Sequence, residues 1–139
     1  MEILKIINVK LIIKAVIVIL AMIFGIRYIK KFIKRNKNKA IINQLDKDIN
    51  VSKLTYSLSY YGLWAEDLYA AMDGPGTDEQ MVYDVFKKMQ TKDDILQIIT
   101  AFGVKEDETL SQWIVNDLSD DERATVNRLL SDKNINYQF

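Results

Sequence analysis

The sequence predicts an all-α protein, with one N-terminal membrane-spanning helix followed by a small helical domain. An apolar stretch with a single charge lies near the N-terminus, and Glu2 is the only acid before Asp46. From Leu58 onward, apolar residues recur at helical spacing between capping and turn residues. A chain of 139 residues has room for one domain plus an anchor. We expect an anchor with a basic flank at 1–35, a stalk or linker at 36–53 and a helical domain at 54–139.

The apolar stretch is the first predicted element. Lys14 is its only charge, and the segment from Ala15 to Ile26 is apolar throughout. A membrane-spanning helix needs about 20 predominantly apolar residues. A cleaved signal peptide and a basic helix lying flat on a membrane are the alternatives. The length of the stretch, the missing small-residue cleavage site and its apolar character on all sides favour a span.

The basic flank that follows predicts the orientation of the span. Its residues are Arg27, Lys30, Lys31, Lys34 and Arg35. By the positive-inside rule, the C-terminal domain stays on the cytoplasmic side, or on the interior side of a virion. These side chains can also contact anionic lipid head groups. Nucleic acid is the weaker alternative partner, because a juxtamembrane basic run usually only sets topology.

The stalk and the first helix of the domain come next. Apolar residues recur at helical spacing in the stalk up to a break at 50–52, and Leu54–Tyr56 reads as a short extended piece. Ser57 is a candidate N-cap for a helix over 58–72. The segment Asp73–Gly76 ends that helix, because glycine adopts positive φ and proline prevents continuation.

Four more helices are expected in the rest of the domain. Thr77–Gln80 and Ser119–Glu122 have the form of capping boxes, which start the second and fifth helices. Thr91 caps the third, which stops at Gly103, and residues 109–118 form the fourth. Five short helices supply a small but sufficient core.

The composition argues against an enzyme. The chain contains no cysteine and no histidine, which removes thiol chemistry, the commonest general base and the commonest zinc ligand. A hydrolase with paired carboxylates is the only remaining class. The acids from Asp93 onward lie where helices begin, and solvated carboxylates are usual there. We therefore expect a protein that is not an enzyme.

The segment Met72–Glu79, which reads MDGPGTDE, resembles the annexin repeat. That repeat is a five-helix right-handed bundle whose first interhelical loop carries a Gly-x-Gly-Thr-Asp motif. The resemblance covers Leu68–Leu130, where the helices follow in the same order, and Asp117–Ser119 matches an acidic residue followed by Leu-Ser. It is also similar to single annexin-like modules in Bacteroidetes and phage proteins, which commonly end in Ile-x-Tyr-x-Phe, as Ile135–Phe139 does here. Annexins have four or more repeats, and this chain has one.

The resemblance implies a calcium site. Its ligands would be the backbone carbonyls of Met72, Gly74 and Gly76, with the carboxylate of Asp117. Calcium takes six to eight oxygens, so water would complete the shell. In the alternative interpretation, the glycines serve the turn, Thr77 caps a helix, and Asp117 makes a loop hydrogen bond.

The combined features predict a membrane-anchored structural or interaction module, as a minor component of a virion or a bacterial envelope. The expected partners are the lipid bilayer and an unidentified protein, and a homo-oligomer stays open. A calcium-dependent membrane-binding module is the alternative. We also expect Ile135, Tyr137 and Phe139 to dock on the domain and to pair with Leu54–Tyr56 as a two-stranded bridge.

Overall fold

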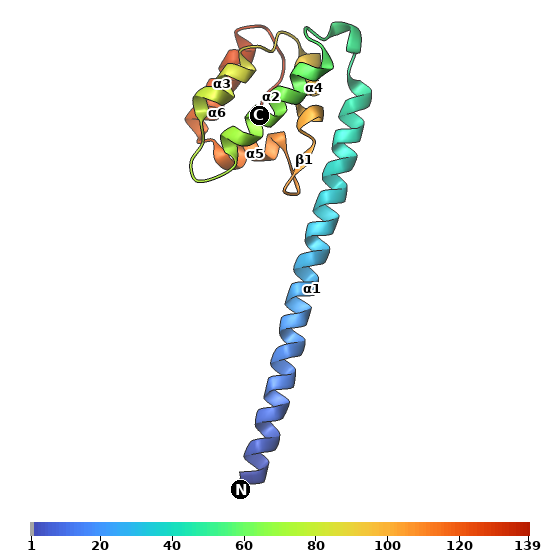
Figure 1. Ribbon diagram of the computed structural model, residues 1–139, viewed down its shortest axis with the longest axis vertical. Coiled ribbons are helices and arrows are strands. Elements are labelled where there is room, and N and C mark those ends of the chain that lie inside the picture. Colours follow the sequence, from blue (N-terminus) through green and yellow to red (C-terminus); the bar gives the residue numbers. More distant parts are fainter. Residues whose placement is uncertain (1) are drawn as a thin grey trace. The chain divides into compact units, whose positions relative to one another are not determined.

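The computed structural model describes residues 2–139, and the side chains of residues 9–139 (Figure 1). The chain divides into two compact units, Met1–Asn36 and Lys37–Phe139, which are described separately below. The described residues are mostly helical, with one long apolar N-terminal helix and one small two-stranded sheet. The predicted helical class is therefore confirmed, whereas the sheet lies where the sequence did not suggest one.

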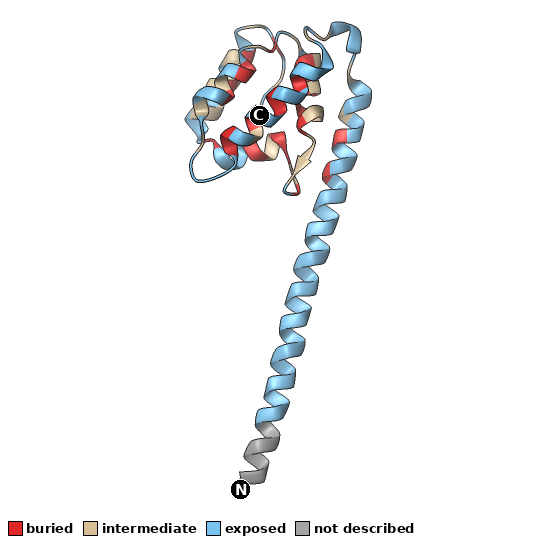
Figure 2. Cartoon of the chain, in the orientation of Figure 1, coloured by how far each residue is buried: buried red, intermediate tan, exposed pale blue. Residues whose placement is uncertain are grey.

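The first helix, α1, runs from Glu2 to Asp48 without interruption. It passes through Asn36–Lys39 because no glycine or proline between Ile26 and Asp48 would end it. In the first unit, every described side chain is exposed (Figure 2). From Ala15 to Ile26, α1 is apolar all round. Such a helix satisfies its own backbone and leaves its side chains for a surrounding apolar medium.

The last turns of α1 belong to the second unit. Ile42 is buried, Leu45 packs against the core, and Asn38 is only 3% exposed. The Nδ2 atom of Asn38 donates to the carbonyl oxygen of Asp107 at 2.7 Å and to Oε1 of Gln112 at 2.8 Å. The segment assigned to the stalk from the sequence thus contributes buried side chains to the domain.

A segment that we call the strap, Asn50–Tyr56, connects α1 to the bundle. It begins with the 3-10 helix η1, Val51–Lys53, whose cap Asn50 accepts from the backbone nitrogen of Ser52. Three residues around the start of α4 fasten the strap. Asp93 Oδ1 accepts from the nitrogen of Asn50 at 2.6 Å, and Thr91 Oγ1 donates to the carbonyl of Lys53 at 3.3 Å. Asp94 accepts from both the nitrogen and the hydroxyl of Thr55, at 2.9 and 2.7 Å.

Five helices form the bundle of the second unit. α2 packs against α3 and α4, α3 packs against α6, and α4 contacts α5. Its largest fully buried side chains include Tyr61, Phe86 and Met72, and buried residues line the inner faces in Figure 2. The helices are α2 Leu58–Met72, α3 Glu79–Phe86, α4 Lys92–Phe102, α5 Leu110–Asp117 and α6 Asp120–Ser131.

The helix caps follow the sequence closely, with one shift. The cap at Thr91 and the capping box at Ser119 are confirmed, and Thr91 also forms a reciprocal capping box, which was not predicted. The predicted cap at Thr77 is wrong by one residue. Asp78 is the N-cap of α3, and its Oδ1 accepts from the nitrogen of Met81 at 3.0 Å. Both side chains can cap, but the carboxylate is the one in reach of the helix nitrogen.

A short hairpin joins α4 to α5. β1, Val104–Lys105, pairs antiparallel with β2, Glu108–Thr109, so that Val104 lies opposite Thr109. The turn residues Glu106 and Asp107 have φ of 50° and 68°. Left-handed backbone is unfavourable for such residues, and the turn contains no glycine from which it could have been predicted. The predicted solvated helix start at these acids is therefore wrong, since they form a hairpin turn.

The C-terminal tail, Ile135–Phe139, docks on the bundle as predicted. Ile135 is buried, and Tyr137 and Phe139 are partly buried against the core. The predicted two-stranded bridge with Leu54–Tyr56 is wrong, because those residues bind the start of α4 through Thr55 instead. Asn127 of α6 takes the place of the strand partner. Its Oδ1 accepts from the nitrogen of Phe139 at 2.8 Å, and its Nδ2 donates to the carbonyl of Phe139 at 3.2 Å.

Candidate functional site

The apolar helix is the first candidate site. Within the described residues, one helix is long and apolar enough to cross a membrane, from Val9 to Asp48. The core helix of a soluble protein passes the same test when it is buried, but none of this apolar window is buried. Its length and composition are those of a membrane anchor or a signal sequence.

The basic flank forms a stripe along one side of α1. Arg27, Lys30, Lys31, Lys34 and Arg35 are spaced by three and four residues, so they share one helix face. We call these five residues the basic stripe. All five side chains are exposed. Tyr28, Ile29, Phe32 and Ile33 occupy the opposite face of the same turns and are exposed too. This part of α1 is therefore amphipathic, a pattern typical of helices at a lipid head-group layer.

The glycine loop, Asp73–Asp78, is the second candidate site. Gly74 and Gly76 have φ of 127° and 93°, which other residues rarely adopt. The nitrogen of Asp78 donates to the carbonyl of Ala71 at 2.8 Å and closes the loop. Among the described residues, nothing donates a hydrogen bond to the carbonyls of Met72, Gly74 or Gly76. These three carbonyls have free lone pairs, as ligands of a hard cation must.

Asp117 lies beside the glycine loop. The hydroxyl of Thr77 donates to the backbone carbonyl of Asp117 at 3.3 Å, which joins the loop to the end of α5. The side chain of Asp117 is exposed, but partial desolvation by its neighbours and the nearby carboxylate of Glu108 raise its pKa above the ordinary value. The described side chains contain no group of three or more carboxylates, histidines or cysteines able to hold a metal ion. A cation at this place would depend on the backbone carbonyls.

A buried carboxylate, Asp94, is the polar centre of the domain, so the prediction that the acids from Asp93 onward are solvated is wrong for this residue. It is 0% exposed. Its Oδ1 accepts from the hydroxyl of Tyr61 at 2.5 Å, and its Oδ2 accepts from the nitrogens of Gln90 and Thr91 at 2.8 and 3.0 Å. With the two bonds from Thr55, every lone pair is engaged. The Thr-x-x-Asp spacing was the available signal, because it marks a capping box.

The environment keeps Asp94 ionised and Tyr61 protonated. Burial alone would raise the pKa of Asp94, but hydrogen bonds from Thr55, Tyr61 and Gln90 outweigh it and lower that pKa. Burial and the bond to Asp94 raise the pKa of Tyr61. Tyr61 therefore stays a donor and Asp94 stays an acceptor. This arrangement suits a structural centre and not a site of proton transfer.

Comparisons with known proteins add no relative. No family model, no curated protein and no solved structure matches the chain.

Proposed function

We propose that this protein is a membrane-anchored, non-enzymatic interaction module, held on a bilayer by α1 and presenting a helical domain to a protein partner. The observation that carries the proposal is the composition of α1. An exposed apolar helix is followed directly by the basic stripe, with an apolar face opposite. Apolar side chains in that number are stable only in an apolar medium or against another protein.

The basic stripe supports the orientation of the anchor. Basic residues close to one end of a span stay on the cytoplasmic side. The same side chains gain about 1 kcal/mol each near an anionic leaflet. The domain then lies in the cytoplasm, or inside a virion if the chain belongs to one. We keep a bacterial or phage membrane as the proposed location.

Membrane extraction tests the anchor. We expect the full chain to stay in the pellet after alkaline carbonate washing of membranes. A double variant, Ile19→Lys with Leu20→Lys, puts two charges at the centre of the span, where each costs about 3 kcal/mol, and releases the chain. The matched control is Ile41→Lys, which changes an exposed apolar residue beyond the basic stripe. Release of the unaltered chain, or a mass showing that residues 1–35 have been removed, contradicts the proposal.

The fold assignment within the proposal is a single annexin-repeat-like module. The five helices α2–α6 follow in the order of that repeat, and the glycine loop lies between the first two. A second candidate function, calcium-dependent membrane binding, is favoured by the unengaged carbonyls of Met72, Gly74 and Gly76 next to Asp117. These residues would hold the ion, which would supply a positive charge able to bind lipid phosphate.

A titration separates the two functions. Calcium is added to the full chain in detergent micelles, and heat is measured by calorimetry, with magnesium as the comparison ion. Binding that Asp117→Asn weakens, and that Asp121→Asn leaves unchanged, supports the calcium function. Asp121 is a suitable control because it is also exposed and lies in the first turn of α6. Absence of calcium binding at millimolar ion removes the second candidate and leaves the anchored module.

A further inference from the structure

The last turn of α1, the strap and the start of α4 border a hollow with an apolar floor. Its volume is about 580 Å³, and all of its lining belongs to the second unit. The floor consists of Leu45, Leu96 and Tyr137, and Leu96 is only 7% exposed. Spaces between packed elements are normally filled by side chains. An unfilled apolar hollow of this size lies within the range of sites that hold small molecules, about 300–1,000 Å³.

Four charged side chains border the same hollow, two of each sign. Asp48 lies at the end of α1, Lys53 lies in the strap, and Lys92 and Asp93 lie in the first turn of α4. A ligand on the apolar floor displaces water from these groups, and a charge that loses water without gaining a partner is costly. A purely apolar ligand therefore does not fit this hollow.

The four charges are not used up by one another. Within residues 9–139, the Nζ atoms of Lys53 and Lys92 form neither an ion pair nor a hydrogen bond. Each carboxylate accepts from a neutral donor. Asp48 accepts from a side-chain amide one turn earlier at 3.3 Å, and Asp93 accepts from the nitrogen of Asn50 at 2.6 Å. Both signs of charge thus stay available to a ligand.

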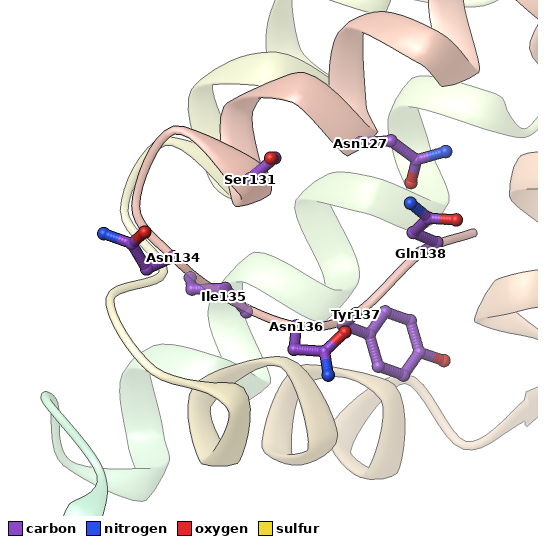
Figure 3. A pocket seen from close by; sticks show the side chains of 7 residues that line it. All are labelled: Asn127, Ser131, Asn134, Ile135, Asn136, Tyr137 and Gln138. Atoms are coloured by element: carbon purple, nitrogen blue, oxygen red, sulfur yellow. The ribbon is translucent and has the colours of Figure 1, made fainter.

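A second hollow, of about 280 Å³, lies between the tail and α6 and differs in its chemistry (Figure 3). Its polar lining consists of amides, such as Asn136 and Gln138, and one serine hydroxyl, and none of its lining residues is charged. Exposed amides of this kind are satisfied by water. An apolar floor with charges of both signs around it therefore distinguishes the larger hollow from the smaller one.

We propose that the larger hollow binds a zwitterion with an apolar body, in chemistry and size a short apolar peptide with free termini. The two lysines pair with the carboxylate of the ligand, the two aspartates pair with its amino group, and its side chains cover the apolar floor. A ligand with one charge leaves the opposite pair of side chains without a partner, and a neutral ligand leaves all four. The site does not depend on whether α1 spans a bilayer, because its lining lies in the second unit.

Four dipeptides with one apolar body test the charge requirement, with the full chain in micelles of a nonionic maltoside. The zwitterion is Leu-Phe with free termini. Acetylation removes its positive charge, amidation removes its negative charge, and both changes together leave it neutral. In calorimetry, the zwitterion binds at least about tenfold more tightly than each of the other three, because a hydrogen bond between charged groups contributes that much. Absence of binding at millimolar zwitterion, or an equal affinity for any of the other three, overturns the proposal.

Charge variants test whether the dipeptide occupies this hollow. Lys92→Gln and Asp48→Asn each weaken binding of the zwitterion by about three- to tenfold. The matched controls are Lys47→Gln and Asp46→Asn, the same changes at exposed residues of α1 that do not line the hollow, and they leave the affinity unchanged. All four altered side chains are exposed, so the fold is retained. Equal losses at the lining residues and at the controls overturn the site.

Hydrogen exchange gives a second measurement that does not depend on the variants. The amide of Asn50 donates to Asp93 at the edge of the hollow, so a bound dipeptide slows its exchange. The amide of Met81, which donates to Asp78 at the start of α3, is the control and keeps its rate. An unchanged rate at Asn50 with millimolar Leu-Phe, or equal slowing at both amides, contradicts the proposal.

Discussion

Replacing Asp94 with asparagine removes the charge at the polar centre of the domain while keeping its shape. The cheapest orientation of the new amide places its nitrogen at the Oδ1 position, because Oδ2 accepts from three donors. The hydroxyl of Tyr61 can rotate to accept from the amide, but the backbone nitrogen of Thr55 is left without an acceptor. One orphaned buried donor, and the weaker bonds of a neutral acceptor, together destabilise by about 2–4 kcal/mol.

The dependence on pH separates the charge from the shape. The pKa of Asp94 is lowered in the folded state, so its contribution is fully present above the unfolded pKa of about 3.9. That contribution is lost as the pH falls from there toward the folded pKa. The difference in unfolding free energy between the unaltered chain and Asp94→Asn is therefore largest at neutral pH and shrinks below about pH 4. The contributions of all other carboxylates are the same in both chains, so they cancel in this difference.

The assay is urea unfolding of residues 37–139, followed by tryptophan fluorescence at pH 7 and at pH 3. Trp64 is a suitable reporter, because its ring lies 5.7 Å from that of Tyr61. Asp93→Asn is the matched control, with the same change of charge one residue earlier and one hydrogen bond to the strap; it costs about 0.5–1.5 kcal/mol. A loss at Asp94 below about 1 kcal/mol, or an equal loss at both pH values, would refute the reasoning.

Three further predictions test the packing of the domain. A fragment of residues 37–139 should unfold cooperatively at a higher temperature than one of residues 51–139, because only the longer one keeps the buried end of α1; equal thermal midpoints would contradict this. Trp113→Ala should destabilise by about 3–5 kcal/mol, since the ring packs on Tyr69 and its Nε1 donates to the carbonyl of Lys105; a loss under about 1 kcal/mol would place it at the surface. Gly62→Ala should stabilise α2 by about 0.5–1 kcal/mol, because the added Cβ meets nothing within 4 Å, whereas Gly103→Ala should destabilise by about 1–3 kcal/mol because φ is 65° there. Chemical unfolding of the three variants measures whether each change raises or lowers the free energy of unfolding.

The helices of the domain were predictable because their limits are set by local chemistry. Gly103 and the pair of Ser119 and Glu122 end or begin helices through contacts within a few residues, and the structure keeps both. Asn38 could not be found in this way. An asparagine among lysines looks solvated, and its partners are distant in sequence, Asp107 in the hairpin turn and Gln112 in α5. The role of Asp94 is long-range for the same reason, since Thr55 and Tyr61 approach it from the other end of the domain sequence.

The candidate site was predictable to different degrees. The basic stripe follows from residue type and helical spacing alone, because both are local. The proximity of Asp117 to the glycine loop is a tertiary contact made through Thr77, and the sequence suggested it only through the resemblance. The docking of the tail depends on Asn127 and Phe86, which carry no pattern linking them to Phe139. Pairing with Leu54–Tyr56 was expected because both segments alternate, but a side-chain amide and a carboxylate were the better partners.

The strap also determines how tension would travel through the chain. A pull between α1 and the bundle is shared between two connections. One is the backbone of Asn50–Tyr56, and the other is the contact of Asn38 and Ile42 with the bundle. That backbone is hydrogen-bonded to the start of α4 at three successive points: Asn50 to Asp93, Lys53 to Thr91, and Thr55 to Asp94. Tension in the strap would therefore be transmitted first to the start of α4, which is packed in the core, and only then to α2. These hydrogen bonds couple the strap mechanically to the core of the domain.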